Sequence, residues 1–492
     1  MSRTLSTSVA VALILVAAIG GAVTPAAAAS GSPTFDPVTI EQAGPLSMNT
    51  TDTVSHFGEP SWLVSTEDTD GLDSLSSWAT SSEDRRIVRQ WNDSNRALVA
   101  ASPAAMGARG LDRLLSTGLA SRSYVESVRL NTVLSKPDPV TLVNESALER
   151  PGTEIFASSY RADGAYSLSG IATSEDAEPT TLLEAREMTG STNVDADTSG
   201  LTAAVIDSGV NTADGLVFGN GTRGSDIRLS NASKDFIEDE TVAEDGLDAV
   251  ADPNGHGTHV AATIASNHSN ASFDGYAPNA EVLALRALDA EGSGSSADIA
   301  AAIRYAAEHD ADVISLSLGS PTYSAAIADA VANATDQGSI VVVAAGNSRQ
   351  TTRWLATPAD APVEGVISVA ASNYSANASN ATVGYFSQLG DDPGTTDLSE
   401  GRTAGQDITV SSVGMQLSAM TPDTGGSVSE TTLTGTSMAA PTVTGGILQA
   451  LAKNPDWQGE PAIVAEAVEK SAQPLPSSTP TETGHGLLRV DN

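Results

Sequence analysis

Three short runs after about residue 200 carry residue types that can perform nucleophilic chemistry. Asp207 follows the apolar run Ala203–Ile206, and His256 opens a helical run between two glycines. Ser437 stands at the start of a third run, which is apolar and helical. A serine hydroxyl is a weak nucleophile unless a neighbouring base takes its proton and a third group orients that base. Taken singly, each residue has an ordinary role in a turn or a helix cap. Together, the three types indicate acyl transfer.

A fourth polar residue, Asn347, ends the buried run Ile340–Ala345. An asparagine there is often only a turn residue, but its amide can also donate a hydrogen bond to a developing oxyanion. His256 and His259 are three residues apart and could form a metal pair, yet no third protein ligand is evident nearby. We therefore expect His259 to be a packed or hydrogen-bonded helix residue.

The residues from about position 201 onward alternate between short apolar runs and Ala-rich helical segments. The predicted strands are Ala203–Ile206, Val282–Leu288, Val313–Leu318, Ile340–Ala345 and Val366–Ala370; the predicted helices are His256–Ser266, Ala297–Ala307, Ser324–Gln337 and Ser437–Leu451. Continuous apolar runs indicate strands that are buried on both faces, as in a parallel sheet. Right-handed crossovers make such an α/β sheet doubly wound, and reactive residues gather at the carboxyl ends of its strands.

Composition excludes several classes of function. The chain has 492 residues, 24 Lys plus Arg, 61 Asp plus Glu, and a net charge of −37. Such a field repels phosphate backbones and anionic headgroups, so we expect no nucleic-acid partner. The absence of cysteine excludes disulfides, thiolate metal sites and a cysteine nucleophile. Only four lysines occur, and this acidic, lysine-poor composition is typical either of proteins from salt-loving microbes or of an ordinary acidic exported protein.

The first 29 residues have the pattern of a secretory signal peptide. One early arginine precedes an apolar run, Val9–Val23, and small residues follow it. The alternative is a membrane anchor, but this run is shorter than the roughly 20 residues that span a bilayer. We therefore expect a secreted, extracellular protein with no stable membrane anchor.

The remaining chain divides into three predicted parts. Residues 30–135 form a small α+β module, with helices near 82–100 and 111–119 and a strand near 124–130. Residues 136–182 read as a linker or exposed segment, and residues 183–492 as the catalytic domain.

The motifs AAVIDSGV, NGHGTHVA and GTSMAAP, in this order, resemble those of the subtilisin-like serine peptidases (subtilases), in particular secreted members from halophilic archaea. The resemblance covers about residues 183–492 and implies the doubly wound, mainly parallel fold of that family. It implies that Ser437 is the nucleophile, His256 the general base and Asp207 the group that orients the base. Asn347 would belong to the oxyanion hole.

The resemblance also implies how substrate is held. The substrate backbone would pair with two edge segments, formed by Ser317, Leu318 and Gly319 and by Ala344, Ala345 and Gly346. Departures from the family pattern, such as Thr442 and Ala440, leave the residue preference open. Catalysis would need no cofactor. The loop Asn267–Asp274 is either a structural Ca²⁺ site or a plain surface loop.

By the same resemblance, the N-terminal module is a propeptide that aids folding and inhibits the enzyme intramolecularly, or else an accessory domain that stays attached. The expected product is a monomeric endopeptidase, made as a precursor, that acts on protein or peptide substrates. Two alternatives stay open: a narrow processing peptidase, and a catalytically silent cell-surface protein that keeps the fold.

Overall fold

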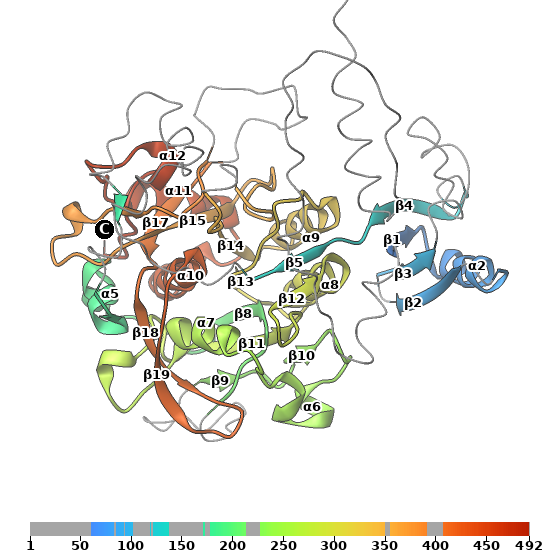
Figure 1. Ribbon diagram of the computed structural model, residues 1–492, viewed down its shortest axis with the longest axis horizontal. Helices are drawn as coiled ribbons and strands as arrows, with labels where there is room; N and C mark the ends of the chain where they lie inside the picture. Colours follow the sequence, from blue (N-terminus) through green and yellow to red (C-terminus); the bar gives the residue numbers. More distant parts are fainter. Residues whose placement is uncertain are drawn as a thin grey trace, which may run out of the picture. The chain divides into compact units, whose positions relative to one another are not determined.

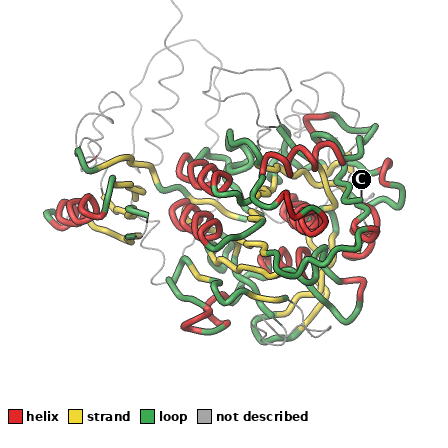
Figure 2. Tube along the Cα trace, turned by 180° about the vertical axis from the view of Figure 1, so that it is seen from behind, coloured by secondary structure: helices red, strands yellow, loops and turns green. Residues whose placement is uncertain are grey.

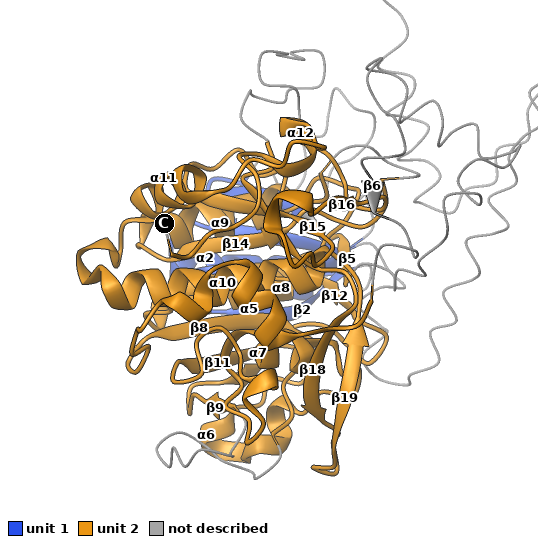
Figure 3. Ribbon diagram, turned by 90° about the vertical axis from the view of Figure 1, so that its left-hand side faces the viewer, with its two compact units in different colours: residues 1–131 blue, residues 132–492 orange. Residues whose placement is uncertain are grey.

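The computed structural model describes residues 61–82, 85–92, 94–101, 119, 122–136, 171–172, 178–212, 227–349, 355–390 and 407–491. The chain forms two compact units, residues 1–131 and 132–492 (Figure 3). The predicted signal peptide and most of the predicted linker lie outside the described residues.

The first unit is a four-stranded antiparallel sheet with one helix packed on it. The strand order is β2-β3-β1-β4, with bounds Arg85–Trp91, Arg96–Ala101, Ser61–Thr66 and Val125–Leu130. Helix α2 (Thr69–Thr80) begins where the Asp68 carboxylate accepts the Gly71 N–H. It buries Leu72 and Leu75 in the same cluster as Val64 of β1. The expected α+β module and its strand near 124–130 are confirmed.

The helix expected near residues 82–100 is wrong. This stretch forms the hairpin of β2 and β3, and the helix found in the described residues of this unit, α2, comes earlier. The turn of the hairpin includes Asn95, whose φ of 52° is in the left-handed region that asparagine tolerates better than most residues. The β-branched pair Ile87-Val88 also favours an extended chain. The helix expected near 111–119 lies outside the described residues except for Leu119.

The second unit is built on a sheet of ten described strands, whose central part is parallel. Its main path runs β10-β11-β8-β13-β14-β15-β16-β6, and β17 pairs with β15. The central strands are β8 (Thr202–Asp207), β11 (Glu281–Arg286), β13 (Val313–Leu316), β14 (Ile340–Ala344), β15 (Val366–Ser372) and β17 (Val410–Val413). They pair in parallel, so their carboxyl ends share one edge. The predicted strands and the doubly wound α/β class are confirmed.

Helices cover both faces of this sheet, as crossover handedness requires. From β8 the chain passes through α7 (His256–Ala265) to β11; it then returns through α8 (Ser296–Glu308) to β13, on the other side of β8. Reversing direction with right-handed crossovers places the two helices on opposite faces. Figure 1 shows α8 beside α9 (Ala325–Asp336) and α7 beside α10 (Thr436–Lys453).

The second unit has two buried hydrophobic clusters, and consecutive residues of β8 alternate between them. Ala203 and Val205 of β8 belong to the cluster that contains α7 and α10, whereas Ala204 and Ile206 belong to the cluster that contains α8 and α9. Because β8 lies where the chain reverses direction across the sheet, the crevice beside its carboxyl end is where such folds bind ligands. Asp207 is the last residue of β8.

Smaller elements surround this core, as the helix and strand colours of Figure 2 show. The remaining strands are β5 (Val133–Ser135), β6 (Ile171–Ala172), β7 (Thr180–Thr181), β9 (Arg228–Leu229), β10 (Lys234–Asp235), β12 (Ser293–Ser295), β16 (Val383–Gly384), β18 (Leu417–Pro422) and β19 (Val428–Leu433). The other α-helices among the described residues are α5 (Leu182–Met188), α6 (Val242–Asp245), α11 (Pro461–Ser471) and α12 (Pro480–Thr483). No helix in the described part of the chain is long and apolar enough to cross a bilayer.

Candidate active site

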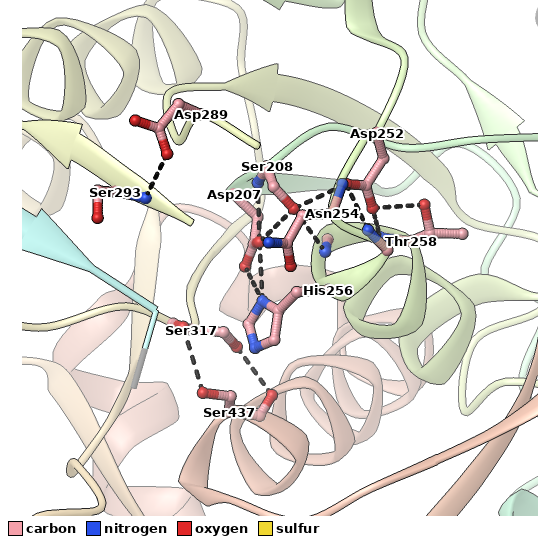
Figure 4. A network of polar contacts seen from close by, with 12 residues as sticks. Asp207, Ser208, Asp252, Asn254, His256, Thr258, Asp289, Ser293, Ser317 and Ser437 are labelled. Atoms are coloured by element: carbon pink, nitrogen blue, oxygen red, sulfur yellow. Dashed lines mark hydrogen bonds and ion pairs between the residues drawn. The ribbon is translucent and has the colours of Figure 1, made fainter. Parts of the chain in front are cut away.

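Asp207 and His256 form a buried, hydrogen-bonded pair at the carboxyl edge of the sheet. Asp207 ends β8 and His256 is the first residue of α7. The His256 Nδ1 atom lies 2.8 Å from Oδ1 and 3.0 Å from Oδ2 of Asp207 (Figure 4). The close approach needs a glycine at 257, because a Cβ atom there would lie 2.3 Å from the Gly209 carbonyl oxygen. The pair leaves the Nε2 side of the imidazole for proton transfer.

Ser437 lies at the N-terminus of α10, where the first-turn N–H groups have no partner within the helix. Its hydroxyl donates to the Ser317 carbonyl oxygen at 3.3 Å, and the Ser317 hydroxyl donates to the Ser437 carbonyl oxygen at 2.9 Å (Figure 4). The Ser437 hydroxyl must therefore rotate from Ser317 toward His256 before it can transfer its proton. Loose contacts of this kind are common in active sites without bound substrate.

Asn347 is oriented by Thr436. Both the backbone N–H and the hydroxyl of Thr436 donate to Oδ1 of Asn347, each at 2.9 Å. These two donors fix the carbonyl side of the amide, so its NH₂ group faces the cleft that Asn347 lines. Gly435 permits this, since a Cβ atom at that position would lie 2.7 Å from Nδ2 of Asn347.

His256, Asn347 and Ser437 line one open cleft of about 420 Å³. Apart from them, most of the lining residues have polar side chains, and most come from the loop before α7, the β18–β19 hairpin and the segment after β5. The lining residues include Lys136, Asn211, Asp252, Asn254, Thr421, Asp423, Thr431 and Thr434. The three predicted catalytic groups that must meet a substrate thus face the same space, with Asp207 buried behind His256.

The two predicted substrate-binding segments differ in how their backbones are used. Gly319 pairs with Ser135 in an antiparallel bridge: Gly319 donates to the Ser135 carbonyl oxygen at 2.8 Å, and Ser135 donates back at 3.1 Å. The Ala345 N–H instead donates to the Val369 carbonyl oxygen, and the Gly346 N–H donates to the Thr436 hydroxyl. Leu318 and Ala344 are buried core residues. Strand pairing with a substrate therefore stays a prediction for both segments.

His259 is a buried helix residue, as expected. Its Nε2 atom lies 3.1 Å from the Leu417 carbonyl oxygen, and burial lowers its pKa to about 4. No group of three or more His, Cys, Asp or Glu side chains that could hold a metal occurs among the residues that the structure describes. In the loop Asn267–Asp274, the side chains of Asn270 and Asp274 each accept a backbone N–H of the loop itself. A structural Ca²⁺ ion there stays a prediction.

Three polar residues around the site escaped the sequence reasoning. Thr436 holds Asn347, and Ser208 and Asp252 form hydrogen bonds behind the Asp207–His256 pair. Their only sequence signal was adjacency: Ser208 follows Asp207, Thr436 precedes Ser437, and Asp252 stands four residues before His256. An aspartate followed by Pro-Asn-Gly is typical of a turn, so the sequence gives no sign of its hydrogen bond with the Ser208 hydroxyl, 44 residues away.

The fold and this constellation are typical of a serine peptidase built on a mainly parallel α/β sheet. The chain belongs to the subtilase family, whose model matches residues 198–486, more than half of the 492 residues. The alkaline protease of Alkalihalobacillus alcalophilus is 34% identical over 291 residues, which cover 58% of this chain and 64% of that protein. Subtilisin Savinase of Lederbergia lenta is 34% identical over 259 residues, covering 53% and 79% respectively.

A solved structure supports the fold assignment. The crystal structure of fervidolysin from Fervidobacterium pennivorans, described as a keratinolytic enzyme related to subtilisin, matches with a TM-score of 0.59 and 22% identity. The match covers 88% of this chain and 60% of that one. The relatives named here are bacterial, so the expected kinship with halophilic archaeal members finds no support among them.

Proposed function

We propose that this protein is a secreted serine endopeptidase that hydrolyses peptide bonds in protein substrates and is made as a precursor. One observation carries the proposal. A segment of the chain itself, β5, lies as an extended strand beside the cleft that holds His256 and Ser437. A peptidase binds its substrate in this conformation, by adding a strand to the edges of the cleft.

The contacts of β5 have the form of strand addition on both sides. Its residues pair antiparallel with β12, and Ser135 also pairs with Gly319. Lys136 continues the segment and donates its N–H to the Gly292 carbonyl oxygen at 2.8 Å. Leu134 is fully buried, whereas the side chain of Val133 is 44% exposed. One side chain enters the protein and its neighbour faces outward, as the strand period requires.

The geometry supports the following reaction. The Ser437 hydroxyl rotates and transfers its proton to Nε2 of His256 while Oγ attacks the scissile carbonyl carbon. Asp207 holds the Nδ1–H of the imidazole and stabilises the positive charge. The carbonyl oxygen becomes an oxyanion that the Asn347 amide and the Ser437 backbone N–H can stabilise.

Collapse of this intermediate breaks the C–N bond, and the departing amine takes the proton from His256. The acyl group stays on Oγ of Ser437 as an ester. Water, activated by His256 as base, then hydrolyses that ester and restores the hydroxyl. No step requires a cofactor.

The position of β5 also supports intramolecular inhibition. Lys136 lines the same cleft as His256 and Ser437, so a segment that stays there excludes substrate. We propose that the N-terminal module acts as a propeptide and that maturation cuts the chain within a few residues after Lys136. The parts are then a signal peptide (1–29), a propeptide (30–135), a linker (136–182) and a catalytic domain (183–492). Ser317, Leu318, Gly319, Ala344, Ala345 and Gly346 form the substrate-binding walls.

The charge of −37 supports a requirement for salt. Carboxylates repel one another over a screening distance that shrinks from about 10 Å at 0.1 M to about 3 Å at 1 M ionic strength. We propose that the enzyme works outside the cell in concentrated salt, as a monomer.

The test compares wild type with Ser437→Ala in casein hydrolysis, in about 3 M and about 0.1 M NaCl. Hydrolysis by wild type alone, strongest in high salt, supports the proposal, and a fluorophosphonate should label wild type but not the variant. The variant should also retain its N-terminal segment. A folded, trimmed wild type that neither labels nor cleaves would overturn the peptidase assignment; labelling with only one or two cleaved products would favour a narrow processing peptidase.

A further inference from the structure

A second carboxylate, Asp252, is buried directly behind the Asp207–His256 pair. Its side chain is 2% exposed and accepts five hydrogen bonds, all from neutral donors (Figure 4). Oδ1 accepts from the N–H groups of Asn254 and Gly255 and from the Ser208 hydroxyl. Oδ2 accepts from the N–H and the hydroxyl of Thr258. Burying an ionised aspartate with no cationic partner among these contacts lowers the stability of the folded protein, so we expect a role that offsets this cost.

Part of that role lies at the start of α7. Gly255, the residue before His256, has no side chain to cap the helix. Asp252 replaces the cap, because it accepts the Thr258 N–H at 2.8 Å in the first turn. A carboxylate also interacts favourably with the positive end of the helix dipole. Asp252 therefore fixes the turn of helix from which the His256 side chain projects.

Ser208 links Asp252 to the pair itself. Its Oγ atom lies 2.9 Å from Oδ1 of Asp252 and 3.2 Å from Oδ1 of Asp207. One hydroxyl proton can serve only one of these two carboxylates. Oδ1 of Asp207 already faces the His256 Nδ1 atom and accepts the backbone N–H of Ser208, each at 2.8 Å. Oδ1 of Asp252 also has two other donors, so the shorter distance is what favours donation of the hydroxyl to Asp252.

We propose that Asp252 is a positioning residue that acts through Ser208: it keeps the Ser208 hydroxyl proton away from Asp207, so that the Asp207 oxygens remain directed at His256. The inference rests on the proposed peptidase function. Without the Asp252 charge, the Ser208 hydroxyl turns to Asp207 and competes there with the His256 Nδ1–H. The imidazole is then held less well while it accepts the proton of Ser437.

The test begins with Asp252→Asn, measured as kcat and KM on a peptide substrate. We expect kcat to fall about 10- to 100-fold, the effect of weakening one hydrogen bond to a charged group, with KM changed less than about threefold. The decisive variant is the double substitution Asp252→Asn with Ser208→Ala. It lacks the competing hydroxyl, so its kcat should rise several-fold above that of Asp252→Asn.

Thr258→Val is the control, because it removes one hydrogen bond from the same carboxylate, together with the acceptor of the Asn211 N–H, and leaves the charge and Ser208 in place. We expect a lower melting temperature and kcat within about threefold of wild type. A double variant slower than Asp252→Asn, or a Thr258→Val enzyme as slow as Asp252→Asn, would reduce Asp252 to a structural role and overturn the inference. An inactive wild type would instead refute the peptidase function.

Discussion

Strand β5 (Val133–Ser135) offers a direct test of how the cleft recognises an extended chain. Leu134 is fully buried in the same cluster as Leu288, Ile299 and Leu318, whereas its neighbour Val133 is largely exposed. If β5 occupies the cleft as a substrate does, a peptide with the sequence of residues 129–136 should inhibit the enzyme. Changing Leu134 to alanine in that peptide should then weaken inhibition far more than changing Val133.

The expected change in the inhibition constant Ki follows from the number of buried carbon atoms that each substitution removes. Leucine to alanine removes three carbons at about 0.8 kcal/mol each, or about 2.4 kcal/mol, which corresponds to a roughly 50-fold higher Ki. Valine to alanine at the exposed position removes carbons that remain largely in water, so Ki should change less than about threefold. Backbone pairing with Gly319 and Gly292 is the same in all three peptides.

The assay measures competitive inhibition of peptide hydrolysis by the wild-type peptide, the Leu134→Ala peptide and the Val133→Ala peptide, in high salt. Equal losses of inhibition from both substitutions would refute the inference that an apolar subsite receives Leu134. No inhibition by the wild-type peptide at millimolar concentration, with an active enzyme, would refute the substrate-like reading of β5.

Further predictions concern the oxyanion donor and the stability of the second unit. Asn347→Ala should lower kcat by about 10²- to 10³-fold with little change in melting temperature. Glu482→Gln should lower the free energy of unfolding by about 1.5–3 kcal/mol in chemical denaturation, because it replaces a charged hydrogen bond to buried Arg349, 2.9 Å away, with a neutral one; a loss below about 1 kcal/mol would contradict this. His259 has a folded pKa of about 4, so only the unfolded state binds its proton between pH 6.5 and 4, and stability falls by up to roughly 3 kcal/mol on acidification. His259→Gln should remove that loss. Burial raises the pKa of Asp235 to about 6 despite the nearby Arg286, so its protonation stabilises the folded state as the pH falls below about 6. Asp235→Asn should therefore steepen the loss of stability on acidification. Equal slopes of unfolding free energy against pH in the His259→Gln and Asp235→Asn variants would refute the assignment of these two pKa values.

The class of fold could be predicted from the sequence because each central strand carries its own burial signal. Runs such as Ile340–Ala345 are apolar at every position, which is expected of strands covered on both faces. The weaker signals of the first unit were misleading. Its hairpin of β2 and β3 was mistaken for a helix, since the polar pairs Arg85-Arg86 and Arg89-Gln90 on either side of Ile87-Val88 suit either element when the packing partner is unknown.

Asp207, His256, Asn347 and Ser437 were determined as candidates by the sequence alone, because each stands in a local motif at a strand end or a helix start. Only the tertiary structure decided what surrounds them. Asp252 and Ser208 meet although 44 residues separate them, Thr436 orients Asn347 across 89 residues, and Ser135 pairs with Gly319 from another part of the chain. The physical reason is that local motifs report backbone geometry within a few residues, whereas hydrogen bonds between distant segments exist only once the sheet has brought its carboxyl edge together.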